Sequence, residues 1–170
     1  MTSKAGQISR IVNISALNRT VFSGNYEADL IDNLRSAGLI ITSLVASDGD
    51  EVIGHILFSQ LSVEIDGRNI GAASLAPMAV KPDRQRQGIG SKLITEGLSV
   101  LRKKQVEAVI VLGHTWLYPR FGFSAGITQH LASPFRGKVS FMGLELTAGA
   151  LASEKGCVKY PEAFGLGNSS

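Results

Sequence analysis

A glycine-rich loop near the middle of the chain has the composition of a phosphate-binding site. The segment from Leu75 to Ser91 reads as a strand, a basic turn and the start of a helix, with glycines at Gly88 and Gly90. Backbone N–H groups at a helix N-terminus have no internal partners, and the helix dipole adds partial positive charge. A glycine lets a ligand approach that backbone because it has no Cβ. The loop therefore predicts a site for a ligand that carries phosphate.

Two common phosphate-binding motifs do not fit this loop. A P-loop requires Lys and then Ser or Thr directly after its second glycine, and the segment Gly88 to Lys92 does not supply them. A dinucleotide fingerprint requires a third glycine at position 93, where the chain has Leu93. What remains is Gln85-x-x-Gly88-x-Gly90, a pattern that is weak when taken alone.

The strand before the loop contains Pro77. Because proline cannot donate a hydrogen bond to a ladder, inside a sheet it marks an edge or a bulge. If pairing lapses there, the amides of Met78, Ala79 and Val80 are free to bind an extended ligand in the manner of an added strand. Simple termination of the strand before Lys81 explains the proline equally well.

The spacing of apolar residues predicts the elements that position this loop. Residues 1–8 read as a loose end. We expect helices over 8–22, 26–34 and 88–104, and strands over 39–46, 51–63, 69–80, 108–112, 127–131 and 139–146. Turn signals at Asp48-Gly49 and Asp66-Gly67 join the first three strands into an antiparallel meander. The strand, helix and strand that follow indicate a crossover to a parallel neighbour.

Composition and charge limit the classes of function. The 170 residues favour a single domain over 1–170, and 44% hydrophobic with 18% charged residues is a globular composition. A net charge of +3 suits a small anionic ligand and does not favour nucleic acid. The single cysteine, Cys157, excludes an intrachain disulfide and a cysteine-based zinc cluster, and we interpret it as a packing residue. Without a signal peptide or a membrane-spanning run, we expect a cytoplasmic protein.

A second motif, Tyr118-Pro-Arg-Phe-Gly-Phe123, follows a complete helix and strand after the loop. With this pair of motifs the chain resembles the GNAT superfamily of acetyl-CoA-dependent N-acetyltransferases, over roughly residues 26–146. The strings GHILFS, LAPMAV, QRQGIGS and YPRFGF look most like the bacterial YhbS-type branch, as does the tail from Gly156 to Phe164. The resemblance implies an α/β (α+β) fold with a mixed, mostly antiparallel central sheet of about six to seven strands. Helices flank that sheet, two strands splay apart to form the cofactor cleft, and residues 147–170 form a C-terminal tail.

The resemblance also implies which residues bind acetyl-CoA, the co-substrate, with no metal. Pantetheine would lie along Met78, Ala79 and Val80. The pyrophosphate would rest on the amides of the loop, namely Arg86, Gln87, Gly88, Ile89, Gly90 and Ser91. The side chains of Arg84, Arg86 and Lys92 either add charge or stay solvated.

The implied chemistry is direct attack of a primary amine on the acetyl thioester. The family's general acid falls on Tyr118, which would protonate the leaving thiolate, because a phenol with a pKa near 10 is protonated at neutral pH. The alternative for Tyr118 is packing beside Trp116 and Phe123. A backbone amide at Ala79 or Val80 would stabilise the oxyanion.

Several features are left open by the sequence. The sequence does not identify the general base, because the strand from Ile70 to Val80 contains no carboxylate. His114 near the cleft and a chain of water molecules to solvent are the two alternatives, and His114 is the less favoured. We interpret His55 as a packing residue. The family usually opens with a strand, and residues 1–8 offer little for one. The acceptor amine cannot be read.

Two other classes of function remain beside acetyl transfer. One is a non-catalytic acyl-CoA sensor or scaffold module. The other is a transferase for a longer acyl group or a hydroxyl acceptor, whose pocket would be wider at Phe58, Met78 or Phe141. Relatives often dimerise through late strands, so a homodimer through Val139–Leu146 and the tail is a further expectation.

Overall fold

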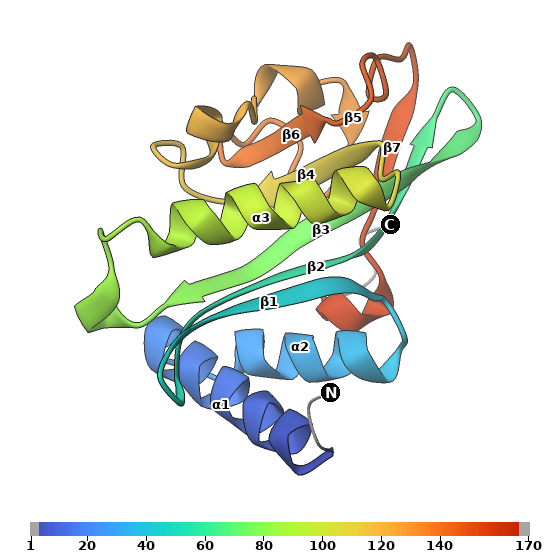
Figure 1. Ribbon diagram of the computed structural model, residues 1–170. Helices are drawn as coiled ribbons and strands as arrows, with labels where there is room; N and C mark the ends of the chain where they lie inside the picture. Colours follow the sequence, from blue (N-terminus) through green and yellow to red (C-terminus); the bar gives the residue numbers. More distant parts are fainter. Residues whose placement is uncertain (1–3, 167–170) are drawn as a thin grey trace.

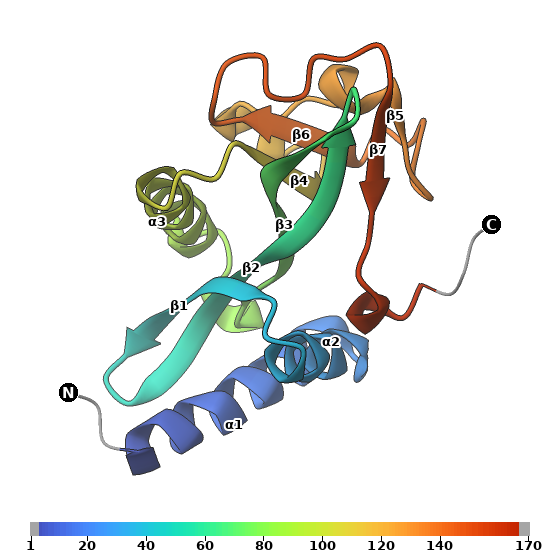
Figure 2. The same ribbon diagram turned by 90° about the vertical axis from the view of Figure 1, so that its right-hand side faces the viewer.

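A seven-stranded, strongly curled sheet runs through the computed structural model, in the spatial order β5-β7-β2-β3-β4-β6 with β1 beside β2 (Figures 1 and 2). The structure describes residues 4–166, and side chains from residue 13 onward. The helices are α1 (Lys4–Phe22), α2 (Tyr26–Ser36) and α3 (Ile89–Lys103). The strands are β1 (Ile40–Asp48), β2 (Glu51–Ile65), β3 (Arg68–Val80), β4 (Ala108–Leu112), β5 (Leu131–Ala132), β6 (Phe141–Glu145) and β7 (Gly156–Lys159). Short 3-10 turns are η1 (Pro82–Arg84), η2 (Tyr118–Phe121), η3 (Gly126–Thr128) and η4 (Glu162–Phe164).

The predicted meander and crossover are confirmed. Strands β1, β2 and β3 pair antiparallel in sequence order, and the chain then returns through α3 to place β4 parallel to β3. At its far end, β2 pairs with β7 instead of β1. The fold is therefore the mixed, mostly antiparallel sheet with flanking helices that the sequence predicts.

Helices cover both faces of β2, so residues 52–59 are buried without alternation. Figure 2 shows α3 on one side of β2 and α1 and α2 on the other. Leu57 packs against α1 and α2, whereas Ile56 and Phe58 pack under α3. A Cβ at Gly97 of α3 would lie 2.3 Å from the Phe58 ring, so only glycine lets the helix approach this closely. Full burial of a side chain such as Phe58 contributes about 2–3 kcal/mol. This packing fixes the helix whose N-terminus follows the glycine loop.

Strands β3 and β4 separate at the centre of the sheet. Their parallel pairing runs only as far as Leu75 opposite Val111, although β3 continues to Val80. The register between β2 and β3 also shifts next to Pro77, and pairing then resumes from Met78. Pro77 therefore marks a bulge, not the end of the strand. Beyond Leu75 the β4-facing edge of β3 has no strand partner among the described residues.

Two predicted segments differ from the structure. Residues 4–8 are the first turns of α1, so within the described residues no strand precedes that helix; residues 1–3 lie outside the description. The predicted strand over 127–131 is wrong: η3 and the two-residue β5 stand there. Thr128 Oγ1 lies 2.9 Å from the carbonyl oxygen of Ala125 and 2.7 Å from that of Phe141, which favours a turn. Between residues 4 and 166, no helix has the length and apolar character needed to cross a membrane.

Candidate active site

A cleft of about 760 Å³ opens where β3 and β4 separate. One wall is the open edge of β3 together with residues 84–86 and 88–91 of the glycine loop. A second wall comes from residues 112–120, which follow β4. The end of α1, the start of α2 and the C-terminal residues Tyr160 and Phe164 line the remaining side. The cleft thus joins segments from both ends and the middle of the chain.

Hydrogen bonding of β3 decides which of its amides face the cleft. The N–H of Lys81 donates to the carbonyl of Ile53 on β2 at 2.8 Å. Because antiparallel residues alternate between their two neighbours, Ala79 also directs its amide to β2, and Met78 and Val80 direct theirs to the open edge. Met78 and Val80 line the cleft, but Ala79 is 2% exposed and does not.

The glycine loop presents a run of unpaired amides at the start of α3. Gly88 is the N-cap with a φ of +85°, and Arg86 also has a positive φ of +63°. The first hydrogen bond into the helix is from the N–H of Lys92 to the carbonyl of Gly88, at 3.0 Å. Within residues 4–166 no protein acceptor is found for the amides of Gly88, Ile89, Gly90 and Ser91. Such a group of N–H donors suits an anion.

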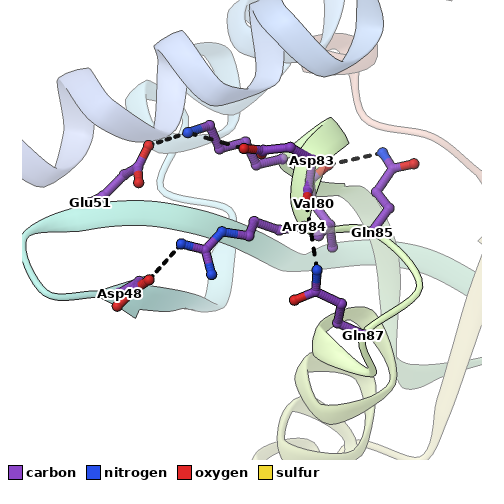
Figure 3. Close-up of polar contacts among 8 residues, drawn as sticks. Asp48, Glu51, Val80, Asp83, Arg84, Gln85 and Gln87 are labelled. Carbon is purple, nitrogen blue, oxygen red and sulfur yellow. Dashed lines mark hydrogen bonds and ion pairs between the residues drawn. The ribbon is translucent and has the colours of Figure 1, made fainter.

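Figure 3 shows the side chains that hold this loop in place. Gln85 Nε2 donates to the carbonyl of Val80 at 3.0 Å, and Gln87 Nε2 reaches the carbonyl of Asp83 at 3.5 Å. Gln87 is the one predicted loop residue that does not line the cleft. The Gln85 bond ties the loop to the end of β3, and the Gln87 bond joins it to η1.

Two ion pairs join the loop to the turn between β1 and β2. Arg84 pairs with Asp48 at 2.5 Å, and Lys81 pairs with Glu51 (Figure 3). The hydrogen bond to Asp48 raises the pKa of Arg84, whose charge is thereby matched within the protein. Lys92 is exposed and does not line the cleft. Arg86 lines the cleft and forms no ion pair inside the described part of the chain. It is thus the candidate cation of the loop for binding an anion.

Tyr118 lies across the cleft from this edge of β3, at the start of η2. Its side chain is 5% exposed, and its ring packs edge-on against Phe123 at 5.6 Å between centroids. The hydroxyl makes no hydrogen bond to the described residues, yet it is not among the fully buried polar atoms, so it remains open to the cleft. Burial raises the pKa of Tyr118 to about 12, which keeps the phenol protonated and able to donate.

Comparison with known proteins shows to which family the chain belongs. The family model described as "Acetyltransferase (GNAT) domain" matches residues 4–126. Over 153 residues the chain is 36% identical to YhbS of Escherichia coli K12, an uncharacterized N-acetyltransferase, covering 89% of this chain and 90% of the relative. The chain belongs to the GNAT acetyltransferases. A second E. coli relative, the uncharacterized N-acetyltransferase YjhQ, is 35% identical over 143 residues, covering 79% of this chain and 78% of YjhQ.

Solved structures of GNAT proteins share the architecture. The crystal structure of E. coli YhbS in complex with CoA matches with a TM-score of 0.81 at 35% identity, covering 91% of this chain and 86% of that one. A GNAT acetyltransferase from Brucella melitensis in complex with acetyl-CoA matches with a TM-score of 0.73 at 33% identity, covering 91% of both chains. The predicted membership of the YhbS-type branch is confirmed.

The two histidines of interest lie in different places in this GNAT fold. His114 is exposed at the cleft rim, where its ring stacks on that of Trp116 at 5.3 Å, and its backbone carbonyl accepts from the N–H of Tyr118. His55 is buried in β2, with Nε2 2.9 Å from Ser43 Oγ, and does not line the cleft. Burial lowers the pKa of His55 to about 4, so it is neutral, as expected for a packing residue.

Two of the three residues expected to shape a pocket for a longer acyl group lie outside the cleft. Phe58 and Phe141 are fully buried in the core and do not border the cleft. Phe58 packs under α3, and Phe141 packs in a second apolar cluster with Leu131 and Leu151. Of the three, only Met78 lines the cleft. Its sulfur lies beside the glycine loop, 3.9 Å from where a Cβ added at Gly90 would stand.

Sequence reasoning missed the wall of the cleft that the start of α2 and the C-terminal segment form. Tyr26 and Glu27 at the start of α2 face Tyr160 and Phe164 from the C-terminal segment, and all four line the cleft. The carboxylate of Glu27 reads in the sequence as an ordinary charge near a helix start. Only the fold shows that it faces a cavity, because nothing in the spacing predicts that η4 packs beside α2 (Figure 2).

Proposed function

We propose that this protein is an N-acetyltransferase that moves the acetyl group of acetyl-CoA to a primary amine by direct attack. The observation that carries the proposal is the convergence of three groups on one cleft. These are the unpaired edge of β3, the free amides at the start of α3 and the protonated hydroxyl of Tyr118. Binding of CoA by E. coli YhbS and of acetyl-CoA by the Brucella protein supports the same ligand here.

The cofactor is expected to follow the open edge of β3. Pantetheine contains amides, so it can pair with the exposed backbone of Met78 and Val80 as an added strand would. Its pyrophosphate is expected on the amides of Gly88 to Ser91, with Arg86 as the nearby cation. We assign Ala79 and Gln87 to support of this surface because neither lines the cleft.

The residues at the centre of the cleft then serve the transfer itself. The amine nitrogen forms a bond to the thioester carbonyl carbon while the carbon–sulfur bond breaks. Tyr118 donates its proton to the departing sulfur, and the proton that the nitrogen loses returns to the phenolate through solvent. The amide of Val80 is the candidate donor to the oxyanion, an interaction worth about 2.7–4 kcal/mol at other acyl-transfer sites.

Calorimetry and thiol release test this function. Wild-type protein is titrated with acetyl-CoA and with CoA, and thiol release is then measured with a panel of primary amines. We expect binding of both nucleotides, and a loss of about 100-fold or more in kcat for Tyr118→Phe with unchanged CoA affinity. Absence of binding at millimolar ligand overturns the proposal.

The same assay separates the enzyme from a sensor. A non-catalytic module binds acetyl-CoA without amine-dependent thiol release. Equal rates of thiol release for wild type and Tyr118→Phe would contradict the role of Tyr118 as the general acid. They would not contradict the proposed transferase activity. Chain-length preference is read from butyryl-CoA, with Met78→Ala as the variant that widens the cleft.

A further inference from the structure

The edge of β3, the glycine loop and residues 112–120 form what we call the near half of the cleft, and a second group of residues forms its far half. This far half is formed by Phe22 at the end of α1, by Tyr26 and Glu27 at the start of α2, and by Tyr160 and Phe164 after β7. If the near half holds acetyl-CoA, the far half is where the acceptor must enter. Its lining can therefore identify the chemical class of the acceptor, and this step depends on the function proposed above.

The aromatic residues of the far half form a connected wall. The hydroxyl of Tyr26 donates to the carbonyl of Phe164 at 2.7 Å, which ties the start of α2 to η4. Tyr160 packs edge-on against Phe164 at 5.1 Å and against Phe135 at 5.3 Å. Burial raises the pKa of Tyr160, so its phenol is neutral in the cleft. Such a wall suits an apolar or aromatic group, because edge-on aromatic pairs are stabilised beyond the burial of their surface.

Glu27 is the only carboxylate on the cleft lining drawn from residues 13–166. It is half-buried and forms no ion pair with those residues. Glu27 lines the same cavity as Tyr26, Tyr160 and Phe164, so its carboxylate shares that cavity with the aromatic wall. A half-buried carboxylate beside aromatic faces attracts a cation, which gains from both the charge and the rings.

A helix-start role does not account for Glu27 by itself. Asp29 lies in the same first turn of α2 and meets the same helix dipole, but it is exposed and does not line the cleft. The helix dipole therefore accounts equally well for an acidic residue at either position. The two residues differ in that only Glu27 lines the cavity. Asp29 is for this reason the matched control for Glu27.

We propose that the acceptor is a primary amine on an aromatic or apolar body, whose ammonium group is recognised by Glu27 and whose body packs on Tyr26, Tyr160 and Phe164. A polyamine or an aminoglycoside fits poorly, because one carboxylate offers one counter-charge. The further ammonium groups of such a molecule would meet the like charges of Arg86 and Arg120, which also line the cleft. Glu27 is a binding residue in this proposal; the amine loses its proton to solvent before it attacks.

The first test is acceptor preference of the wild-type protein. Thiol release from acetyl-CoA is compared for 2-phenylethylamine, spermidine, free lysine and kanamycin. We expect kcat/KM for 2-phenylethylamine to exceed that for each of the others by about tenfold or more, the gain that burial of an aromatic body gives. A higher kcat/KM for spermidine, lysine or kanamycin overturns the inference and leaves acetyl transfer intact. No thiol release with any amine overturns both.

The second test isolates the charge of Glu27. In Glu27→Gln the KM for 2-phenylethylamine should rise about tenfold or more, because the ammonium loses its counter-charge. The KM for acetyl-CoA should not change, and Asp29→Asn should behave as wild type. The neutral analogue 2-phenylethanol, used as an inhibitor, should bind wild type and Glu27→Gln equally well. An equal loss of affinity for amine and alcohol would mean that Glu27 acts through structure alone, and would overturn its assignment.

Discussion

A methyl group on Gly113 would lie 2.3 Å from Cε2 of Tyr118, well inside any permitted contact. The glycine at the end of the β4 segment therefore determines where the proposed acid stands. Leu117, next to Tyr118, is buried, and Tyr118 itself packs on Phe123, so the ring has little room to retreat. The position of the hydroxyl depends on a residue that carries no chemistry.

Gly113→Ala should lower activity more than it lowers stability. The ring must move toward the cleft, and a displacement of about 1 Å can cost about 100-fold in rate. Overpacking should lower the free energy of unfolding by about 1–3 kcal/mol. Thiol release and urea unfolding measure the two effects. Gly71→Ala is the control, because its Cβ would meet Glu107 Oε2 at an ordinary 3.6 Å. Unchanged kcat in Gly113→Ala would show that the ring position is not critical.

Ionisation of Tyr118 should not lower the rate of acetyl transfer at any pH used in an ordinary assay. Burial raises the pKa of Tyr118 to about 12, so the acid stays protonated at every pH below that value. An alkylamine acceptor has a pKa near 10, so kcat/KM should rise with pH up to about 10 as the neutral amine accumulates. Circular dichroism at each pH establishes that the protein is folded. A descending limb near pH 8–9 that Tyr118→Phe lacks would contradict this prediction.

His55 should make the protein sensitive to mild acid. Its pKa is lowered to about 4, first by burial and then by Arg35, and its Nδ1 has no hydrogen-bond partner among the described residues. Because the unfolded state takes up the proton first, stability is full above pH 6.5 and is lost as the pH falls toward 4. The shift corresponds to roughly 3 kcal/mol. Urea unfolding from pH 7.5 to 4.5 measures it.

A variant at this position separates His55 from the carboxylates that also protonate in acid. His55→Gln keeps a polar group near Ser43 but has no ionisation in this range. The difference in unfolding free energy between wild type and variant should shrink as the pH falls. Parallel curves for the two proteins would show that His55 is not the source of the acid sensitivity.

Much of the near half of the site could be predicted because its signals are local. Turn pairs such as Asp66-Gly67, the bulge at Pro77 and the glycines of the loop each act within a few residues of chain. The splay of β3 from β4 followed from the family resemblance and is confirmed by the loss of pairing after Leu75.

The far half could not be predicted, because its residues meet only through tertiary packing. Glu27 and Tyr160 are separated by most of the chain and are brought together by the bond from Tyr26 to Phe164. The same reason explains the error over residues 127–131, where an apolar run suggested a strand. There the side chain of Thr128 contacts Phe141, a partner that no local pattern reveals.

The glycine loop offers a prediction with a closely matched control. Gly88 and Gly137 have φ values of +85° and +84°, and a Cβ at either would meet no atom within 4 Å. Alanine at either position therefore costs only backbone strain, about 1–2 kcal/mol. Thermal unfolding should show similar losses for Gly88→Ala and Gly137→Ala.

Binding of CoA should nevertheless distinguish the two variants. Gly88 is the N-cap of α3, so relief of its strain turns the amides of Ile89 and Gly90 away from a common anion. Calorimetry should show a Kd for CoA raised about tenfold in Gly88→Ala, since several charge-assisted hydrogen bonds weaken together. Gly137 does not line the cleft, and its variant should bind as wild type does. Equal CoA affinity in both variants would place the pyrophosphate elsewhere than on the start of α3.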